Sequence, residues 1–311
     1  MNWKLKAAIQ NIIAALPSSL SYKTYYAVQR VFGGLRSVNP VGRLQAGIDL
    51  VDHIEKQGGR VDGKVFLEVG TGRRLSVPLA LWLCGASKVI TVDLNPYLET
   101  ALVRKDMCFI RDNRESVRKL FKGYAERPVF RERFKALASQ DAEDISIWMR
   151  KADIRYLAPA DAANLDIPGQ SVDYHVSFTV LEHIPSDTLG GIMREGGRVL
   201  KTDGLFVHYV DFSDHFSHSD KDITAVNFLQ FDEEKWDRYA GNRYMWHNRL
   251  RIDEFLDLLK SSGLRVLSSE TKVDGRSLDT LKLGQLRLDR RFKDKTDEAN
   301  ATSSAWIAAT R

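Results

Sequence analysis

The chain has 311 residues, of which 43% are hydrophobic, and its formal net charge at pH 7 is +5. A chain of this length and composition can bury a large core, so we expect one elaborated domain or one domain with a cap. No apolar run reaches the roughly 20 residues of a membrane-spanning helix, and two cysteines give no disulfide framework, which suits a reducing cytoplasm.

The first 60 residues predict a helical cap ahead of the first strand. Residues 1–16 indicate an amphipathic helix with Lys4 and Lys6 on its polar face, and Pro17 ends it. Its apolar positions are Trp3, Ile9, Ile12, Ile13 and Leu16. The apolar part is too short and too interrupted for a signal peptide. We expect the helix to dock onto the protein body, with contact to an anionic membrane surface as the alternative.

A glycine turn between two short strands is the most informative stretch. Residues 65–69 form an apolar run typical of a buried strand in a parallel sheet. Gly70-Thr71-Gly72 then predicts a tight turn that a ligand can approach closely, at which the next helix points its amide groups and positive dipole end. A second strand, residues 88–92, ends at Asp93, where a nucleotide-binding βαβ unit places its ribose-binding carboxylate.

The pattern around this turn differs from a dinucleotide site. A third glycine is absent, and Arg74 stands at the last position of a G-x-G-x-G pattern. Glu68, the two glycines and Asp93 together resemble the class I methyltransferases that use S-adenosylmethionine. The resemblance implies that Glu68 and the glycine turn hold the methionine end of this cofactor, and that Asp93 binds the ribose, with Leu94 beside it. A structural glycine turn in another α/β domain is the alternative.

Residues 98–150 predict a helical insertion rich in basic residues. These are Arg104, Lys105, Arg111, Arg114, Arg118, Lys119, Lys122, Arg127, Arg131, Arg133 and Lys135. Such a concentration of charge would attract an anionic substrate, a membrane surface or nucleic acid. Interleaved acids, including Glu115, Glu126 and Glu132, favour a solvated helix face of mixed charge. No nucleic-acid partner is expected, because no recognised binding module accompanies the charge.

The stretch after the insertion extends the resemblance. A third strand at 154–157 leads to Asp161-Ala162, and a fourth at 172–178 leads to Leu-Glu-His at 181–183. This combination resembles the type 11-like subgroup of class I methyltransferases, whose substrates are small molecules, lipids and sugars. The resemblance implies that Asp161 and Ala162 bind the adenine ring and that Ser177 also lies at the cofactor.

The remaining elements complete the fold class, an α/β, Rossmann-like sheet of seven strands. Helices are expected at 186–201 and 251–262, and strands at 205–209, 264–267 and 305–308. The resemblance implies that the last strand runs antiparallel between two others. A charged segment before it, residues 286–298, is expected to be an exposed loop. The methyltransferase domain would thus span residues 61–311.

Three of the seven histidines lie within residues 208–220, just after the fifth strand. Ligands in open α/β sheets bind beyond the carboxyl ends of the strands, so these side chains should face the methyl acceptor. A neutral histidine can take the proton of a hydroxyl while a carboxylate orients its other nitrogen. His215, with Asp211 four residues earlier, is the first candidate for this base, and His208 and His183 are the reserves.

Two other interpretations of the histidine-rich segment remain open. Histidine and aspartate are good ligands of divalent ions, which could acidify a sugar diol. The spacing matches no strong metal signature, so no metal ligand is assigned. A polar surface loop without a catalytic histidine is the other possibility.

Residues 212–250 lie where this fold commonly carries a substrate lid. Trp236, Tyr239, Tyr244 and Trp246 are interleaved with basic residues, so they either stack on sugar rings or anchor the lid to the core. The same region resembles bacterial methyltransferases associated with surface polysaccharides and other glycans.

We therefore expect a cytoplasmic protein that uses S-adenosylmethionine to methylate a hydroxyl of a sugar or glycan, an anionic one included. Peripheral contact with the inner face of the membrane is compatible with this expectation. The alternatives are methylation of a lipid-like or quinone-type small molecule, and a non-catalytic cofactor-binding scaffold. The sequence leaves the acceptor's identity and the oligomeric state open.

Overall fold

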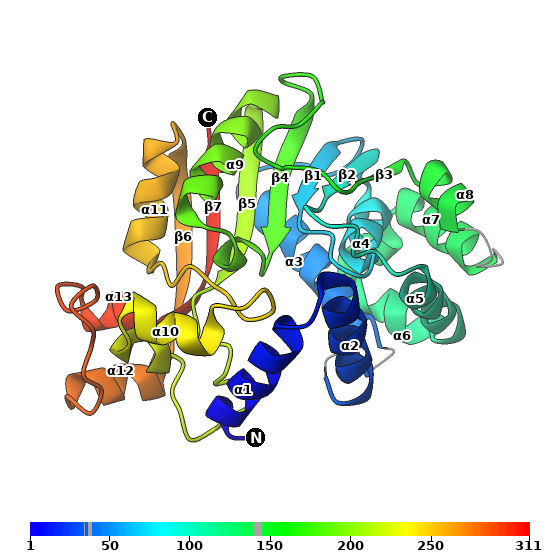
Figure 1. Ribbon diagram of the computed structural model, residues 1–311. Helices are drawn as coiled ribbons and strands as arrows, with labels where there is room; N and C mark the ends of the chain where they lie inside the picture. Colours follow the sequence, from blue (N-terminus) through cyan, green and yellow to red (C-terminus); the bar gives the residue numbers. More distant parts are fainter. Residues whose placement is uncertain (34, 37–38, 140–144) are drawn as a thin grey trace.

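The computed structural model describes residues 1–33, 35–36, 39–139 and 145–311. Its centre is a seven-stranded sheet with the order β3-β2-β1-β4-β5-β7-β6 (Figure 1). The strands are β1 Val65–Val69, β2 Lys88–Val92, β3 Ile154–Leu157, β4 Val172–Phe178, β5 Leu200–Asp211, β6 Arg265–Val273 and β7 Thr302–Thr310. Strands β1 to β5 pair in parallel, and β7 runs antiparallel between β5 and β6. The expected fold class is confirmed, including the antiparallel last strand.

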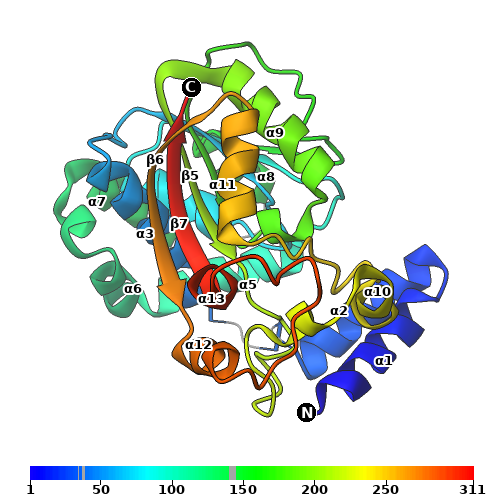
Figure 2. The ribbon, with the colours of Figure 1, turned by 90° about the vertical axis from the view of Figure 1, so that its left-hand side faces the viewer.

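Helices cover both faces of the sheet, so its central strands β1 and β4 are buried along most of their length. One face packs against α3 Val41–Lys56, α4 Ser76–Cys84, α5 Thr100–Asp112, α6 Arg114–Leu120, α7 Pro128–Ser139 and α8 Ile145–Lys151. The other face packs against α9 Ser186–Val199 and α11 Ile252–Ser261. Figure 2 shows α9 and α11 on one side of β5 to β7, with α3, α6 and α7 on the other.

The predicted N-terminal cap divides between two parts of the molecule. Helix α3 belongs to the helical layer on the sheet, where Ile48 and Val51 are fully buried. Helix α1, Trp3–Ala14, and helix α2, Ser18–Val31, lie near the carboxyl ends of the strands (Figure 1). Helix α1 docks through Trp3, whose ring lies 4.8 Å from that of Tyr239. The expected apolar face is wrong in part, because Ile9 and Ile12 point to solvent, with exposed fractions of 39% and 69%.

The insertion after β2 is a structural part of the core as well as a basic surface. It contains α5 to α8 and a short 3-10 helix, η1 Lys122–Glu126, and its apolar side chains join the core beside α3 and α4. Arg118 and Arg131 both pair with Glu126, and Arg127 pairs with Glu55 of α3. These pairs favour the mixed-charge surface over a free cationic patch.

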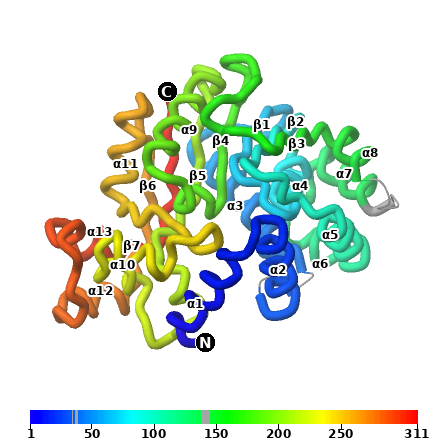
Figure 3. The backbone as a smooth tube through the Cα atoms, in the orientation of Figure 1, coloured from blue at the N-terminus to red at the C-terminus, as the bar shows by residue number. Residues whose placement is uncertain are grey.

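The segment between β5 and α11 folds over the carboxyl ends of the strands. It contains η3 Asn227–Gln230 and α10 Glu233–Ala240, and Figure 3 follows it from β5 to the side of α1. Two short helices, α12 Gly275–Lys282 and α13 Asp297–Ala301, lie between β6 and β7. The expected exposed loop at 286–298 is confirmed for most of its length, since helix α13 begins only at Asp297, but Phe292 is fully buried in the same cluster as Trp3 and Trp236. Among the described residues, no helix has the length and hydropathy to traverse a bilayer.

Candidate active site

The glycine turn after β1 has the tight geometry that the sequence predicts. Gly70 and Gly72 have positive φ angles of 91° and 65°, which favour glycine. A Cβ atom on Gly70 would lie 2.4 Å from the side chain of Val180, which follows β4. The amide of Gly72 donates to the Asp93 carboxylate at 2.8 Å. The ends of β1, β2 and β4 are therefore in direct contact at this turn.

Glu68 places a carboxyl group at the base of the turn, with 4% of its surface exposed. Burial raises the pKa of Glu68 to about 7, although a hydrogen bond from Thr91 and the nearby Arg43 charge act in the opposite direction. The Thr91 hydroxyl also lies 2.6 Å from that of Thr71. A buried carboxyl group with so few donors is suited to receive a cationic ligand group.

A cavity of about 450 Å³ opens over this turn. Its walls include Glu68 and the whole turn from Gly70 to Gly72, together with Tyr97 and Phe178. A carboxyl group at the base and a glycine cradle that a Cβ would fill fit the amino-acid end of S-adenosylmethionine. Thus the residues present are compatible with the cofactor that the sequence implied.

Arg74, which stands where a third glycine is usual, forms an ion pair with a residue of the insertion. Its guanidinium group pairs with Asp106 of α5, a residue only 3% exposed that also accepts a hydrogen bond from Ser76. The guanidinium group is thus held at α5, while Arg74 still lines the cavity over the turn. This pairing explains how the loop tolerates a long side chain at that position.

The other predicted cofactor residues lie at the same edge of the sheet, where their roles remain predictions. Asp93 accepts from Gly72 and from the amide of Asn95, and Leu94 is 68% exposed. Asp161 and Ala162 follow β3 but do not line the described cavity. The Asp161 carboxylate accepts the amide of Ala163 at 2.8 Å, so it shapes its own turn.

Ser177 and His208 require correction, because both lie inside the sheet. They are 0% and 1% exposed, and the Ser177 hydroxyl lies 2.8 Å from Nδ1 of His208. His175, also fully buried, contacts the other nitrogen of His208 at 3.2 Å. Burial holds the pKa of His208 well below its ordinary value. Hence His208 cannot serve as a base for an external acceptor, and Ser177 presents no surface to a cofactor.

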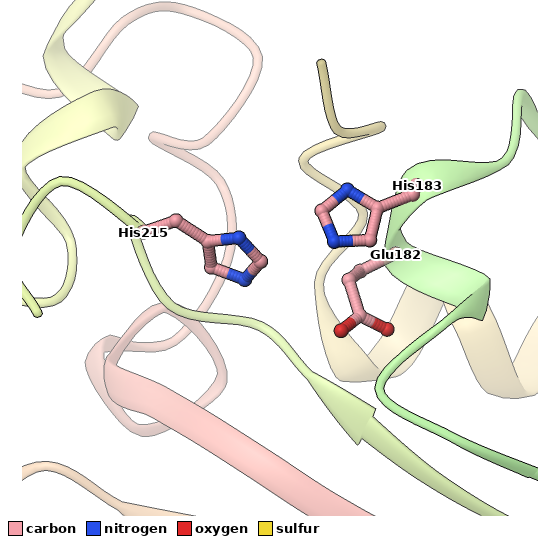
Figure 4. A group of neighbouring side chains, drawn as sticks. All are labelled: Glu182, His183 and His215. Atoms are coloured by element: carbon pink, nitrogen blue, oxygen red, sulfur yellow. The ribbon is translucent and has the colours of Figure 1, made fainter. Parts of the chain in front are cut away.

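Two other predicted residues, His183 and His215, come together with Glu182. Glu182 and His183 lie on the 3-10 turn η2, Leu181–His183, and His215 lies four residues after β5. One ligand-type atom from each of the three lies within 4.8 Å of the others. Figure 4 shows the side chains pointing toward a common space from two separate segments.

Asp211 adds a second carboxylate beside this group. Its Oδ2 lies 3.6 Å from Nε2 of His215, and Ser213 donates to its Oδ1 through both the backbone amide and the hydroxyl. Burial disfavours the charge, but the contacts with His215 and Ser213 outweigh it and lower the pKa of Asp211 to about 2. Asp214, by contrast, is fully buried and bound to Asn227. Asp211 is therefore the acid positioned beside His215.

The lid segment fixes the turn that carries Glu182 and His183. The Asn248 side chain donates to the carbonyls of Leu181 and Ile184. Its backbone amide donates to the carbonyl of Glu182. His247 stacks on His215, with ring centroids 4.9 Å apart. Sequence reasoning did not assign Glu182 to the site, although the Leu-Glu-His pattern was a signal for it, and it considered His247 only as one of several polar residues of the lid.

Three side chains of the lid segment anchor it to the rest of the protein. Trp236 is 2% exposed within the cluster around Phe228, and Arg249 donates to the carbonyls of Phe228 and Phe231, so both anchor the lid. Tyr244 stacks on Tyr25 of α2 at 3.8 Å. Anchoring therefore accounts for these three side chains.

Comparisons with known proteins give one family match and several similar folds. Residues 128–208 match the family model described as a methyltransferase domain. The chain is similar to an S-adenosylmethionine-dependent methyltransferase from Mesorhizobium loti (15% identity, 84% of this chain and 96% of that chain, TM-score 0.44). It is also similar to a protein from Pyrococcus horikoshii (15% identity, 92% and 98%, TM-score 0.48). No curated protein matches the sequence.

The matched residues include β3, β4 and most of β5, which are the strands that carry the predicted adenine and acceptor ends of the site. This family match over residues 128–208 and the order and directions of the seven strands both agree with the expected Rossmann-like methyltransferase fold.

Proposed function

We propose that the chain is an S-adenosylmethionine-dependent methyltransferase that transfers the methyl group to a hydroxyl oxygen of a sugar or glycan. The observation that carries the proposal is the contact between the two halves of the site. Gly70 approaches Val180, which immediately precedes the turn bearing Glu182 and His183. A cofactor over the glycine turn would thus lie beside a group of histidines and carboxylates able to handle a hydroxyl proton.

The cofactor half would bind through residues at the ends of β1, β2 and β3. Bound S-adenosylmethionine supplies an electrophilic methyl carbon on a sulfonium centre. Glu68 would receive the ammonium group, and the positive-φ glycines allow close approach to their backbone. Asp93 would accept the ribose hydroxyls, with the exposed Leu94 and the Asp161-Ala162 turn at the adenine end.

The acceptor half would bind and deprotonate the hydroxyl. His215 takes the proton as the oxygen attacks, a role suited to an imidazole near neutral pH. Asp211 stays ionised 3.6 Å away and stabilises the imidazolium that forms. His183, 5.0 Å from His215 between ring centroids, lies on the other side of the same space.

A polar cavity next to Asp211 supports a hydroxyl-rich acceptor. The cavity measures about 310 Å³, and Asp211, Ser213, Lys221 and Lys272 are among the residues that line it. It lies close to the cofactor cavity, because Tyr209, which lines it, stacks on Phe178, which lines the cofactor cavity. The two lysines suit an acceptor that carries negative charge.

Methylation of a lipid-like or quinone-type molecule is the second candidate. Helix α1 exposes Leu5, Ile9 and Ile12, which recur at spacings of four and three residues and so share one face. Such a face would favour a cytoplasmic protein in peripheral contact with a membrane, where lipid-like acceptors are found.

Methyl-transfer assays with a panel of acceptors would distinguish a sugar or glycan acceptor from a lipid-like or quinone-type one. The chain is incubated with methyl-labelled S-adenosylmethionine and either nucleotide sugars and acidic oligosaccharides or quinols and prenylphenols. We expect label in a sugar methyl ether, identified by mass spectrometry. Label confined to the quinols or prenylphenols would overturn the sugar assignment.

A further inference from the structure

We propose that Glu182, His183 and His215 bind a divalent metal ion of the zinc class. Two imidazoles and one carboxylate form a three-ligand set typical of catalytic zinc, which leaves a fourth position open. One potential ligand atom from each residue lies within 4.8 Å of the other two (Figure 4). The proposal departs from the sequence-based expectation, in which no residue was assigned to a metal.

The carboxylate of Glu182 gives the strongest reason to expect a cation. The residue is 3% exposed, and within the described part of the chain neither of its carboxylate oxygens has a hydrogen-bond partner. A buried ionised carboxylate is unfavourable, so the group either stays protonated, as the raised pKa of Glu182 indicates for the ion-free chain, or ionises when a cation compensates it. Asn248 holds the surrounding turn in place, so the side chain is kept in the interior.

His183 is oriented as metal-binding histidines usually are. Its Nδ1 donates to the carbonyl of Trp246 at 2.9 Å, which leaves the lone pair of Nε2 free. A backbone acceptor on the far nitrogen fixes both the tautomer and the direction of the ring. His183 is exposed, so an ion could reach it from solvent.

His215 completes the set from the other segment. Its Nε2 is buried and has no hydrogen-bond partner among the described residues, and Asp211 adds negative charge 3.6 Å away. His247 packs behind the ring. Two ligands of a tetrahedral zinc ion lie about 3.4 Å apart, given bonds of about 2.0–2.2 Å. Binding would therefore draw the side chains closer than they stand.

The open fourth position would take the acceptor hydroxyl, a role that rests on the proposed function. A metal-bound hydroxyl loses its proton more readily, and that proton would leave to solvent because His215 is then a ligand. The oxygen lone pair forms the new carbon–oxygen bond. The electrons of the carbon–sulfur bond remain on sulfur, so S-adenosylhomocysteine leaves.

Titration of the chelator-treated full chain with Co²⁺, followed by visible absorption, tests the binding of the ion. We expect one saturable site with a tetrahedral spectrum, which Zn²⁺ displaces. Glu182→Gln, His183→Ala and His215→Ala should each weaken binding at least about tenfold. His218→Ala is the matched control, because its ring lies 5.1 Å from that of His215 but outside the set, and its binding should be unchanged.

Absence of a saturable site, or equal Co²⁺ affinity in Glu182→Gln and the parent chain, would overturn the proposal. His183→Ala changes an exposed side chain, so it tests the site even if a buried substitution prevents folding. Calorimetric binding of S-adenosylhomocysteine by every variant checks the fold. Binding of Co²⁺ without S-adenosylhomocysteine would remove the proposed function and leave the metal site standing, and the reverse pattern would do the opposite.

Discussion

The two halves of the site are built in different ways. The cofactor half comes mainly from one βαβ unit, and its key polar groups have partners close by, as when Asp93 accepts from Gly72. The acceptor half combines segments near residues 182, 215 and 247, and within the described residues several buried polar atoms of Glu182, His215 and His247 have no hydrogen-bond partner. We infer that the first half is a preformed cradle, whereas the second is completed by what it binds.

Replacement of His215 should separate the halves most strongly. His215→Ala is expected to lower turnover about 10²–10⁴-fold, since it removes the proposed base or, with an ion bound, one of the ligands of that ion. Affinity for S-adenosylhomocysteine should stay within about twofold. Steady-state kinetics with calorimetry measure both, and His53→Ala on α3 serves as a control of the same residue type. Unchanged turnover in His215→Ala would reject this residue as part of the acceptor half.

A methyl group on Gly70 should damage the cofactor half. Gly70→Ala combines a φ of 91° with a Cβ only 2.4 Å from Val180, so we expect about 100-fold weaker binding of S-adenosylhomocysteine. Gly58→Ala is the control, because its φ is 82° but its Cβ would meet nothing within 4 Å. If calorimetry finds equal affinity in the two variants, the close approach at Gly70 does not matter for the cofactor.

Removal of the Asp93 carboxylate should weaken the same half less. Asp93→Ala deletes the acceptor of two backbone amides and of the proposed ribose contacts, so we expect about 10–30-fold lower affinity for S-adenosylhomocysteine. Asp112→Ala, at an exposed acid on α5, should leave the affinity unchanged. Undiminished affinity in Asp93→Ala would remove the ribose assignment.

The pH dependence of the unfolding free energy should show that burial of the Glu68 carboxyl group destabilises the folded chain when this group ionises. The pKa of Glu68 is about 7 in the folded chain and lies near 4.5 ordinarily. Between these values the folded state keeps a proton that the unfolded state releases, so stability falls as pH rises through this window. Relative to Glu68→Gln, the ligand-free chain should lose about 1–3 kcal/mol of unfolding free energy from pH 4.5 to 8.

Urea denaturation at several pH values measures this difference directly. Other shifted groups, such as Asp214, are common to both proteins and cancel in the comparison. Identical pH profiles for the two proteins would mean that Glu68 carries no such cost.

The geometry of the glycine turn could be predicted from the sequence because its signals are local. An apolar run, two glycines and an acid at the next strand end specify a turn whose geometry depends on few distant contacts. Even the departure at Arg74 has a simple cause, although its partner Asp106 lies 32 positions further on and could not be identified from spacing alone.

The acceptor half was harder to predict from the sequence, because it depends on the direction in which each side chain points. His208 and His215 belong to one histidine-rich stretch, yet the first points into the sheet beside Ser177 and the second into the site. Glu182 became a candidate only when its burial and lack of partners were known. Neither property follows from residue spacing.

Calorimetric titration with S-adenosylhomocysteine tests most directly that the glycine turn binds the cofactor. The account predicts one site of micromolar affinity, which is strongly weakened in Gly70→Ala and retained in His215→Ala. Absence of saturable binding, or binding that is indifferent to Gly70, would contradict it.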